Sequence, residues 1–274
     1  MRVRPYDKIF EAACRKPALW IEPDAFLRYL PIIDWIKYQS PAVKILELGS
    51  GDFGLSTYLP CALVKVDLSF SRLPRSLSSQ IAADAVALPF RDDSFDLVFA
   101  VDLFEHVYQQ ARVKVLAEML RVSAHHVLAV FPCGAKARLQ DLGLALYYER
   151  KWSKKLDILK VHERMPFPEE DEIEGWLKPQ LAKIQNWRVR KSFNLTLRGF
   201  LARGWLMQIP WVLNMIRFCL NFPGIFRFGH LGECYRRILS IRKDEGSGYP
   251  STSLRVVSEV EPSFDKLRMR HRNT

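Results

Sequence analysis

Four short, mostly apolar runs separated by longer segments constrain the fold more than any other feature of this chain. The runs are Lys44–Leu48, Leu63–Ser69, Phe95–Val101 and His126–Pro132. Each has the length of a strand and too little alternation for a sheet with one solvated face, which is typical of strands buried on both sides. Between the last two runs, Ala111–Val122 carries apolar residues at helical spacing. We therefore predict an α/β fold, a doubly wound parallel sheet with helices on both faces.

The segments that flank these runs are also predicted to be ordered. Apolar residues recur at helical spacing before Pro41, which predicts an N-terminal helical cap over residues 1–40. Residues 135–180 are predicted to be largely helical, with one helix over Ala135–Leu159 and another over Pro168–Leu177, where acidic residues suit a helix start. Two further strands are expected at Ile184–Phe193 and Tyr235–Ile241.

A glycine-rich turn directly follows the first run. Gly49, Gly51 and Gly54 form a Gly-x-Gly-x-x-Gly pattern, and Asp67 ends the second run sixteen residues beyond Gly51. Glycine lets a backbone approach a ligand closely, because it has no Cβ and adopts positive φ easily. In open α/β sheets, ligands bind outside the carboxyl ends of the strands, where an aspartate can accept hydrogen bonds from ribose hydroxyls. The pattern predicts a site for an adenosine-containing cofactor.

The glycine spacing by itself fits two classes of cofactor. It satisfies the dinucleotide fingerprint, so an NAD(P)-dependent oxidoreductase is one alternative. However, Glu47 lies two residues before the first glycine, where a carboxylate would repel a pyrophosphate and favour a cationic ligand. The residues that follow the second run distinguish the two classes of cofactor better than the glycines do.

Those residues form an ordered series of short motifs. ILELGSG begins at Ile45 and VDLS at Val66, and the run DA…LPF…DSFDLVF…D.FEHV spans Asp84–Val107. Over about residues 44–132, a third of the chain, the sequence resembles the class I S-adenosylmethionine-dependent methyltransferases. It is most similar to their type 11 branch, which includes the ubiquinone/menaquinone C-methyltransferases. The resemblance implies a Rossmann-like, mostly parallel sheet of seven strands, S-adenosylmethionine as cofactor, and methyl transfer (EC 2.1.1.-).

The resemblance also implies which residues bind the cofactor. The methionine moiety would be held by Glu47 and the backbone of Gly49, Ser50 and Gly51, and the ribose diol by Asp67. The other implied contacts are Leu68 and Ala85 beside the adenine, Asp84 at its amino group, and Val101 and Asp102 near the departing methyl group.

The segment after the glycines departs from the family pattern. The third glycine comes one residue later than usual, and the stretch up to Asp67 is short and interrupted by Pro60. Because proline ends a helix, the first crossover helix is predicted to be clipped to Phe53–Leu59.

No catalytic residue is assigned from the sequence. His106, which follows Glu105, is a candidate base, a wall of the cofactor pocket or a contact at a helix start. His162 and Glu163 are candidate substrate contacts. The five cysteines are scattered and include no C-x-x-C pair, so neither a disulfide framework nor a metal site is expected, and Cys133 is predicted to be a small buried apolar residue.

An apolar stretch over residues 195–231 is expected to be a helical insert before the last strand. Its longest uncharged run is the thirteen residues Gly204–Ile216, too short for a bilayer span of about 20 residues. Arginines flank its aromatic side chains, as in helices that lie in a membrane interface. The insert is interpreted as a lid over the substrate, as an anchor in the membrane interface, or as a surface for a protein partner. The first two interpretations are compatible with each other.

Charge is concentrated at the carboxyl-terminal end of the chain. Residues 186–274 hold 16 Lys and Arg against 6 Asp and Glu, whereas the preceding residues are nearly balanced. This excess raises an RNA-directed methyltransferase as a second alternative, but no aromatic-and-basic RNA motif accompanies it, and no nucleic-acid partner is expected. We expect a methyltransferase domain over residues 41–244 and a disordered tail over residues 245–274.

The acceptor and the location follow from the same features. The apolar insert favours a small-molecule or lipid-like methyl acceptor. The cysteine pattern and the charged, proline-containing opening, which lacks the apolar run of a signal peptide, predict a cytoplasmic protein. If the insert is an interfacial anchor, residues 195–231 would contact the inner face of the membrane.

Overall fold

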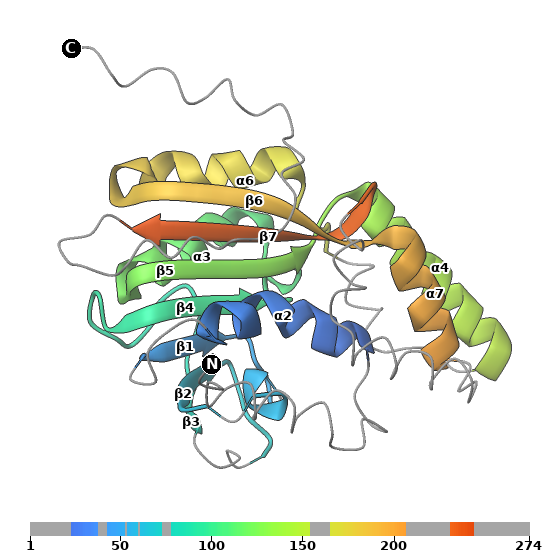
Figure 1. Ribbon diagram of the computed structural model, residues 1–274, viewed down its shortest axis with the longest axis horizontal. Coiled ribbons are helices and arrows are strands. Elements are labelled where there is room, and N and C mark those ends of the chain that lie inside the picture. Colours follow the sequence, from blue (N-terminus) through green and yellow to red (C-terminus); the bar gives the residue numbers. More distant parts are fainter. Residues whose placement is uncertain are drawn as a thin grey trace, which may run out of the picture.

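The computed structural model is built around one seven-stranded sheet with the strand order β3-β2-β1-β4-β5-β7-β6 (Figure 1). It describes residues 23–37, 43–52, 54–59, 61–72, 78–153, 165–206 and 231–243. Strands β1 to β5 pair in parallel, and β7 is antiparallel to both β5 and β6. The predicted α/β class and the mostly parallel sheet of seven strands are confirmed.

Most of the elements lie close to where the sequence places them. The strands are β1 (Ile45–Leu48), β2 (Leu63–Asp67), β3 (Ser78–Ala82), β4 (Phe95–Val101), β5 (Ser123–Pro132), β6 (Ile184–Asn194) and β7 (Cys234–Lys243). The helices are α2 (Pro23–Lys37), α3 (Gln109–Val122), α4 (Ala135–Trp152), α6 (Glu170–Leu177) and α7 (Leu195–Leu206), with the short 3-10 turns η2 (Leu55–Thr57), η3 (Phe104–His106) and η4 (Lys178–Lys183).

Two apolar cores lie on the two faces of the sheet. Alternate residues of β4 point to opposite faces, so Leu97 and Phe99 join one core while Val98 and Ala100 join the other. The first core is closed by α2 and α7, and the second by α3 and α6. Helices on both faces explain why the central strands read as continuous apolar runs in the sequence.

The order of the strands reverses between β1 and β4. The chain runs outward from β1 through β2 to β3, and then returns to the other side of β1 to form β4 and β5. In sheets of this kind, the crevice at the carboxyl ends of the two strands on either side of the reversal is where ligands bind. The glycine-rich turn after β1 and Asp102 after β4 both lie at that point.

Three elements differ from the prediction. β3 was not located, because its sequence SSQIA is polar and it lies at the sheet edge, where little burial is needed. In place of a clipped crossover helix over Phe53–Leu59, the structure has a single 3-10 turn, η2. Helix α4 ends at Trp152 rather than Leu159, because Ser153 adopts a left-handed conformation (φ 51°).

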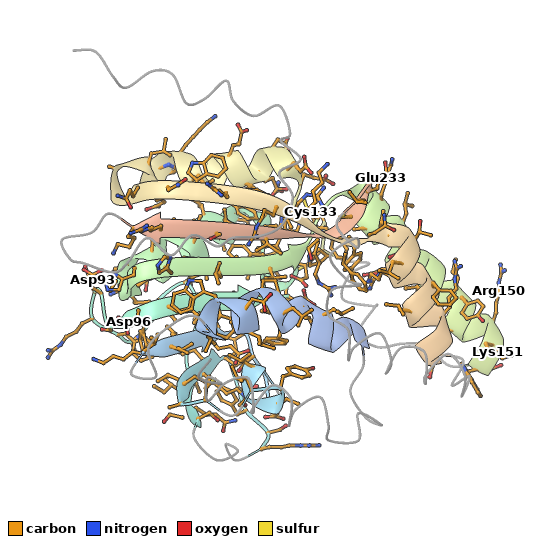
Figure 2. The ribbon with its side chains drawn as sticks, in the orientation of Figure 1. Asp93, Asp96, Cys133, Arg150, Lys151 and Glu233 are labelled. Carbon is orange, nitrogen blue, oxygen red and sulfur yellow. The ribbon has the colours of Figure 1, made fainter. Side chains whose placement is uncertain are left out.

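Helices α4 and α7 pack against each other and extend beyond the carboxyl ends of the strands (Figure 1). In Figure 2, Asp96 near the amino end of β4 and Cys133 after the carboxyl end of β5 mark the two ends of the central strands. Arg150 and Lys151 mark the far end of α4. Cys133 is buried, as predicted. The predicted tail (245–274), the start of the cap (1–22), His162, Glu163 and residues 207–230 of the insert lie outside the described residues.

Candidate functional site

The glycine-rich turn after β1 is shaped by backbone conformations that glycine tolerates. Gly49 and Gly51 have φ angles of 70° and 51°. The Gly49 amide donates to the Val66 carbonyl of β2 at 2.8 Å, which ties the turn to the neighbouring strand. A Cβ on Gly49 would lie 2.8 Å from Leu103, whereas a Cβ on Gly51 would meet nothing within 4 Å. The open side of the turn, where another group could approach the backbone, is therefore at Gly51.

Asp67 at the end of β2 holds this turn from the neighbouring strand. Its two carboxylate oxygens accept hydrogen bonds from the amides of Gly51, at 2.7 Å, and Leu68, at 2.8 Å. Each carboxylate oxygen has a second lone pair, so the half-buried side chain can still accept from a pair of hydroxyls. Leu68 beside it is 73% exposed, which is unusual for leucine and places an apolar side chain at the rim of the crevice.

Asp52 and Lys65 extend the same scaffold, and sequence reasoning assigned them no role. Asp52 accepts from the amides of Ser71, at 2.9 Å, and Arg72, at 3.1 Å, and its bond from the Ser71 hydroxyl lowers the pKa of its carboxyl. The buried Lys65 donates to the Asp52 carbonyl at 3.1 Å. The turn after β1 is thus fastened both to β2 and to the loop that follows β2.

Glu47 is buried beneath the turn instead of standing open to the crevice. It is 1% exposed, and its carboxylate accepts from the Tyr29 hydroxyl and the Leu55 amide, each at 3.0 Å. Burial raises the pKa of Glu47 from 4.5 to about 7, against the opposing effects of these hydrogen bonds and of Lys65. Glu47 positions the turn through η2, and its direct contact with a methionine moiety stays a prediction.

Gly54 explains why the third glycine comes late in the pattern. It has φ 59°, and a Cβ there would lie 2.5 to 2.9 Å from the Glu47 carboxylate. We expect Gly54→Ala to lower the free energy of unfolding by about 3 kcal/mol or more, because a left-handed alanine costs about 1–2 kcal/mol and the clash adds to it.

Gly51→Ala is the matched control for this substitution. It also places a Cβ on a residue with positive φ, but without the clash, and should cost only about 1–2 kcal/mol in urea unfolding. Equal losses for the two variants would contradict the tight packing of Gly54 on Glu47.

Asp102 directly follows β4 and is held by two arginines from distant parts of the chain. Arg236 of β7 donates from Nε, at 3.2 Å, and from Nη2, at 3.0 Å, and Arg28 of α2 donates from its other side. Asp102 has φ 51°, a conformation that aspartate tolerates better than most residues. The ion pairs fix α2 across the carboxyl end of β4.

Glu105 lies behind Asp102 with one oxygen unsatisfied. It is 1% exposed, and its Oε2 atom has no hydrogen-bond partner among the residues that the structure describes. Burial, reinforced by the charge of Asp102, raises its pKa well above the usual range of a glutamate. His106, the candidate base, is exposed at the end of η3.

The remaining predicted contacts are placed as follows. Asp84, after β3, is exposed and accepts from the Val86 amide at 3.0 Å, and Ala85 beside it is half-buried. The side chain of Val101 is 5% exposed and packs in the core beneath α2, so only its backbone faces the crevice. The structure thus brings the ends of β3, β2, β1 and β4 to one edge, with Asp84, Asp67, the glycine turn and Asp102 in that order.

Sequence reasoning missed the side chains that close this edge, namely Arg28, Tyr29 and Arg236. They are separated from their carboxylate partners by 74, 18 and 134 residues. No local pattern links them, since the pairs exist only after α2 and β7 have packed against the sheet.

Comparison with known proteins agrees with this geometry. Residues 46–131 match the family model described as a methyltransferase domain. No curated protein matches the sequence.

Two solved structures share the fold, both of phosphoethanolamine N-methyltransferase 2 from Haemonchus contortus. The complex with S-adenosylmethionine has a TM-score of 0.53 and 14% identity over 87% of this chain. The complex with phosphomonomethylethanolamine and S-adenosylhomocysteine has a TM-score of 0.50 and 14% identity over 86% of this chain. This chain spans only 56% and 60% of the length of those two.

The fold and the site together define a Rossmann-like α/β protein whose glycine turn and acidic side chains gather at the carboxyl ends of neighbouring strands. The segment that builds the crevice is the one that matches the methyltransferase domain, and the likeness to the two solved structures extends to the fold of most of the chain.

Proposed function

We propose that this protein is an S-adenosylmethionine-dependent methyltransferase acting on a small-molecule or lipid-like acceptor. The observation that carries the proposal is the pairing of Asp67 with the open glycine turn at Gly51, where the strand order reverses. The match of residues 46–131 to a methyltransferase domain supports it.

The chemistry of the strand ends fits this cofactor better than a dinucleotide. Asp67 ends β2 and Asp84 follows β3, both at this edge. Carboxylates suit a ligand that combines a sulfonium cation with ribose hydroxyls and an amino group, and they would repel a pyrophosphate. An NAD(P) cofactor remains the second candidate, favoured only by the glycine spacing.

Each residue of the site has a defined task in this proposal. Asp67 would bind the ribose hydroxyls, Asp84 and Ala85 would border the adenine with Leu68, and the backbone of Gly49, Ser50 and Gly51 would face the amino-acid end. When bound, the cofactor supplies a methyl group activated by positively charged sulfur. The protein contributes mainly alignment, which can supply roughly 7–11 kcal/mol of barrier reduction.

A base is needed only for an acceptor atom that must first lose a proton. His106 is exposed at the end of η3 and is the candidate base that would accept this proton. Asp102 is already neutralised by two arginines, so its task is to hold α2 and β7 in place.

The finer parts of the proposal concern the acceptor and the setting. We propose a lipid-like acceptor on two grounds, the motifs over Glu47–Val107 and the apolar insert over residues 195–231. We further propose a cytoplasmic protein that contacts the membrane through residues 195–231. No helix in the described ranges is both long and apolar enough to cross a bilayer.

Isothermal titration with S-adenosylmethionine and with NADH tests the proposal. We expect wild-type protein to bind S-adenosylmethionine and not NADH. Asp67→Ala should weaken that binding by about 10- to 100-fold, because it removes the hydroxyl acceptor and the anchor of the Gly51 amide.

Asp171→Ala is the matched control, since Asp171 is an exposed carboxylate in the first turn of α6. It should leave the affinity unchanged. NADH binding without S-adenosylmethionine binding, or unchanged affinity in folded Asp67→Ala, would overturn the proposal.

A further inference from the structure

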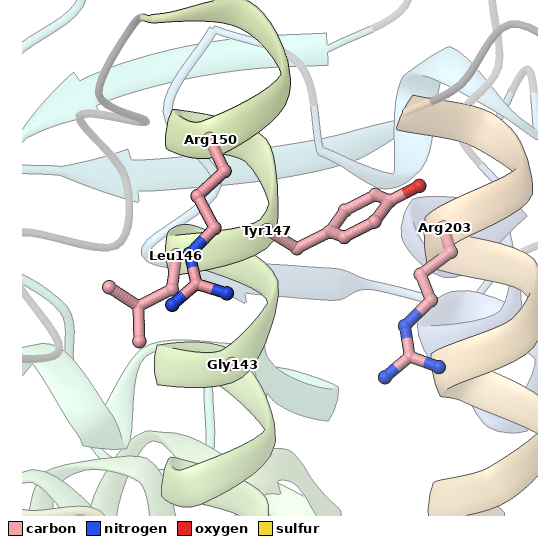
Figure 3. A pocket seen from close by; sticks show the side chains of 5 residues that line it. All are labelled: Gly143, Leu146, Tyr147, Arg150 and Arg203. Atoms are coloured by element: carbon pink, nitrogen blue, oxygen red, sulfur yellow. The ribbon is translucent and has the colours of Figure 1, made fainter.

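We infer that a pocket between α4 and α7 binds the phosphate of an anionic phospholipid headgroup and so docks the protein on a membrane surface. The pocket is lined by Gly143, Leu146, Tyr147 and Arg150 of α4 and by Arg203 of α7 (Figure 3). The two helices extend past the carboxyl ends of the strands (Figure 1), and none of the lining residues belongs to the glycine turn or to a strand end. The inference deepens the proposed membrane contact and rests on it.

The cationic side chains of this pocket have no partner among the residues that the structure describes. Arg150, Arg203 and Tyr147 make no hydrogen bond or ion pair with any residue that the structure describes. Arg198, on the same helix as Arg203, is by contrast bound to Asp141 at 2.8 Å. Figure 3 shows Tyr147 and Arg203 reaching into the space between the helices. Two unpaired guanidinium groups with a hydroxyl between the helices form a donor set suited to a phosphate.

An apolar stripe runs along the outer face of α4 beside these arginines. Leu139, Gly143, Leu146 and Arg150 follow one another at intervals of three and four residues, so they share one face of the helix. Leu139 is 66% exposed and Leu146 is 56% exposed. Apolar residues at this spacing normally form the helix face that packs on a protein core, but here the two leucines are exposed to solvent.

The surroundings favour a lipid over a free phosphate ion. Trp152 at the end of α4 and Phe200 on α7 are each 46% exposed, which adds two aromatic side chains of the kind that settle at a membrane interface. The two helices together hold six Lys and Arg against two Asp and Glu. Exposed apolar groups beside unpaired cations complement an anionic lipid surface, whereas a soluble anion would use only the cations.

The docking surface is physically connected to the crevice. Asp141 of α4 accepts from the Tyr235 hydroxyl at 2.7 Å, and Arg198 of α7 stacks on the Tyr235 ring at 3.4 Å. Arg236, the next residue, holds Asp102 at the end of β4. Docking through α4 and α7 would therefore bring the end of the sheet that carries the crevice to the membrane, where a lipid-like acceptor resides.

Co-sedimentation with phosphatidylcholine vesicles, with and without phosphatidylglycerol, tests the inference. We expect the full chain to bind the anionic vesicles and not the neutral ones. The variant Arg150→Ala/Arg203→Ala should bind them about 30-fold more weakly, the loss expected for two cations at an anionic surface. Leu139→Gln/Leu146→Gln, which keeps both arginines, should also bind more weakly.

The double variant Arg91→Ala/Arg188→Ala is the matched control, because it removes the same charge from exposed positions away from α4 and α7. It should bind anionic vesicles nearly as well as wild type, and thermal unfolding should show all variants to be folded. Equal binding to both vesicle types, an equal loss in the control, or full binding by the leucine variant would overturn the inference. The last result would show that the exposed leucines do not contribute to binding at the anionic surface.

The vesicle assay contains neither cofactor nor methyl acceptor. Vesicle binding without S-adenosylmethionine binding in the calorimeter would overturn the proposed activity and leave this site standing. S-adenosylmethionine binding without vesicle binding would overturn this site and leave the proposed activity standing.

Discussion

Raising the pH from about 5 to about 8 is expected to destabilise the wild-type protein by about 2 kcal/mol relative to Glu47→Gln. Burial raises the pKa of Glu47 from 4.5 to about 7, so the folded protein keeps this proton in a range where the unfolded chain has lost it. Stability linked to this proton is fully present below pH 4.5 and is lost as the pH rises through about 7.

Glutamine is the right replacement because it resembles the protonated carboxyl in shape and cannot ionise. It can still accept from the Leu55 amide and the Tyr29 hydroxyl, the two groups that contact Glu47. Glu105, whose pKa is also raised, is present in both proteins, so its effect cancels in the difference.

Urea unfolding of both proteins at several pH values measures the difference. We expect the stability of the wild type to approach that of Glu47→Gln at low pH and to fall below it as Glu47 ionises. A difference that stays constant across this range would show that Glu47 is already ionised in the folded protein, and would contradict its burial beneath the glycine turn.

Arg112→Ala is expected to lower the free energy of unfolding by about 3–5 kcal/mol. Arg112 is fully buried on α3, and its guanidinium donates to the carbonyls of Phe104, at 2.9 Å, and Pro166, at 2.5 Å, and to the Glu172 carboxylate at 2.9 Å. Its removal leaves buried acceptors without donors and opens a cavity beneath η3.

The same substitution should loosen the turn that carries Glu105 and His106, because Arg112 of α3 donates to the Phe104 carbonyl of η3. Lys114→Ala, an exposed position on the same helix, should change stability by less than about 0.5 kcal/mol. Guanidinium unfolding gives both values, and a loss below about 1 kcal/mol for Arg112→Ala would show that the turn is held by other contacts.

Local patterns in the sequence were sufficient to predict most of the sheet. β4 was predicted with its observed bounds, and β1, β2, β6 and β7 within a few residues. Each of these strands except β6 is largely buried, so its apolar composition is imposed by the sheet itself. β3 escaped prediction because an edge strand needs neither an apolar run nor regular alternation.

The surroundings of the site depended on contacts that no local pattern contains. Glu47 was recognised as a residue next to the glycine turn, but the structure shows that it supports the turn from below through Leu55 and Tyr29. Asp102, which was predicted to lie near the departing methyl group, is ion-paired with Arg28 and Arg236. The roles of the cofactor contacts stay predictions until binding is measured.

The succession of strands and helices along the chain, the glycine turn and the acidic residues at the strand ends can be recognised from local sequence, because each depends on neighbours within a few positions. The packing of distant segments determines which carboxylates are buried, which arginines neutralise them, and which arginines on α4 and α7 find no partner within the described part of the chain. Those outcomes depend on residues far apart in the chain, and the free energy of a charge depends on what finally surrounds it.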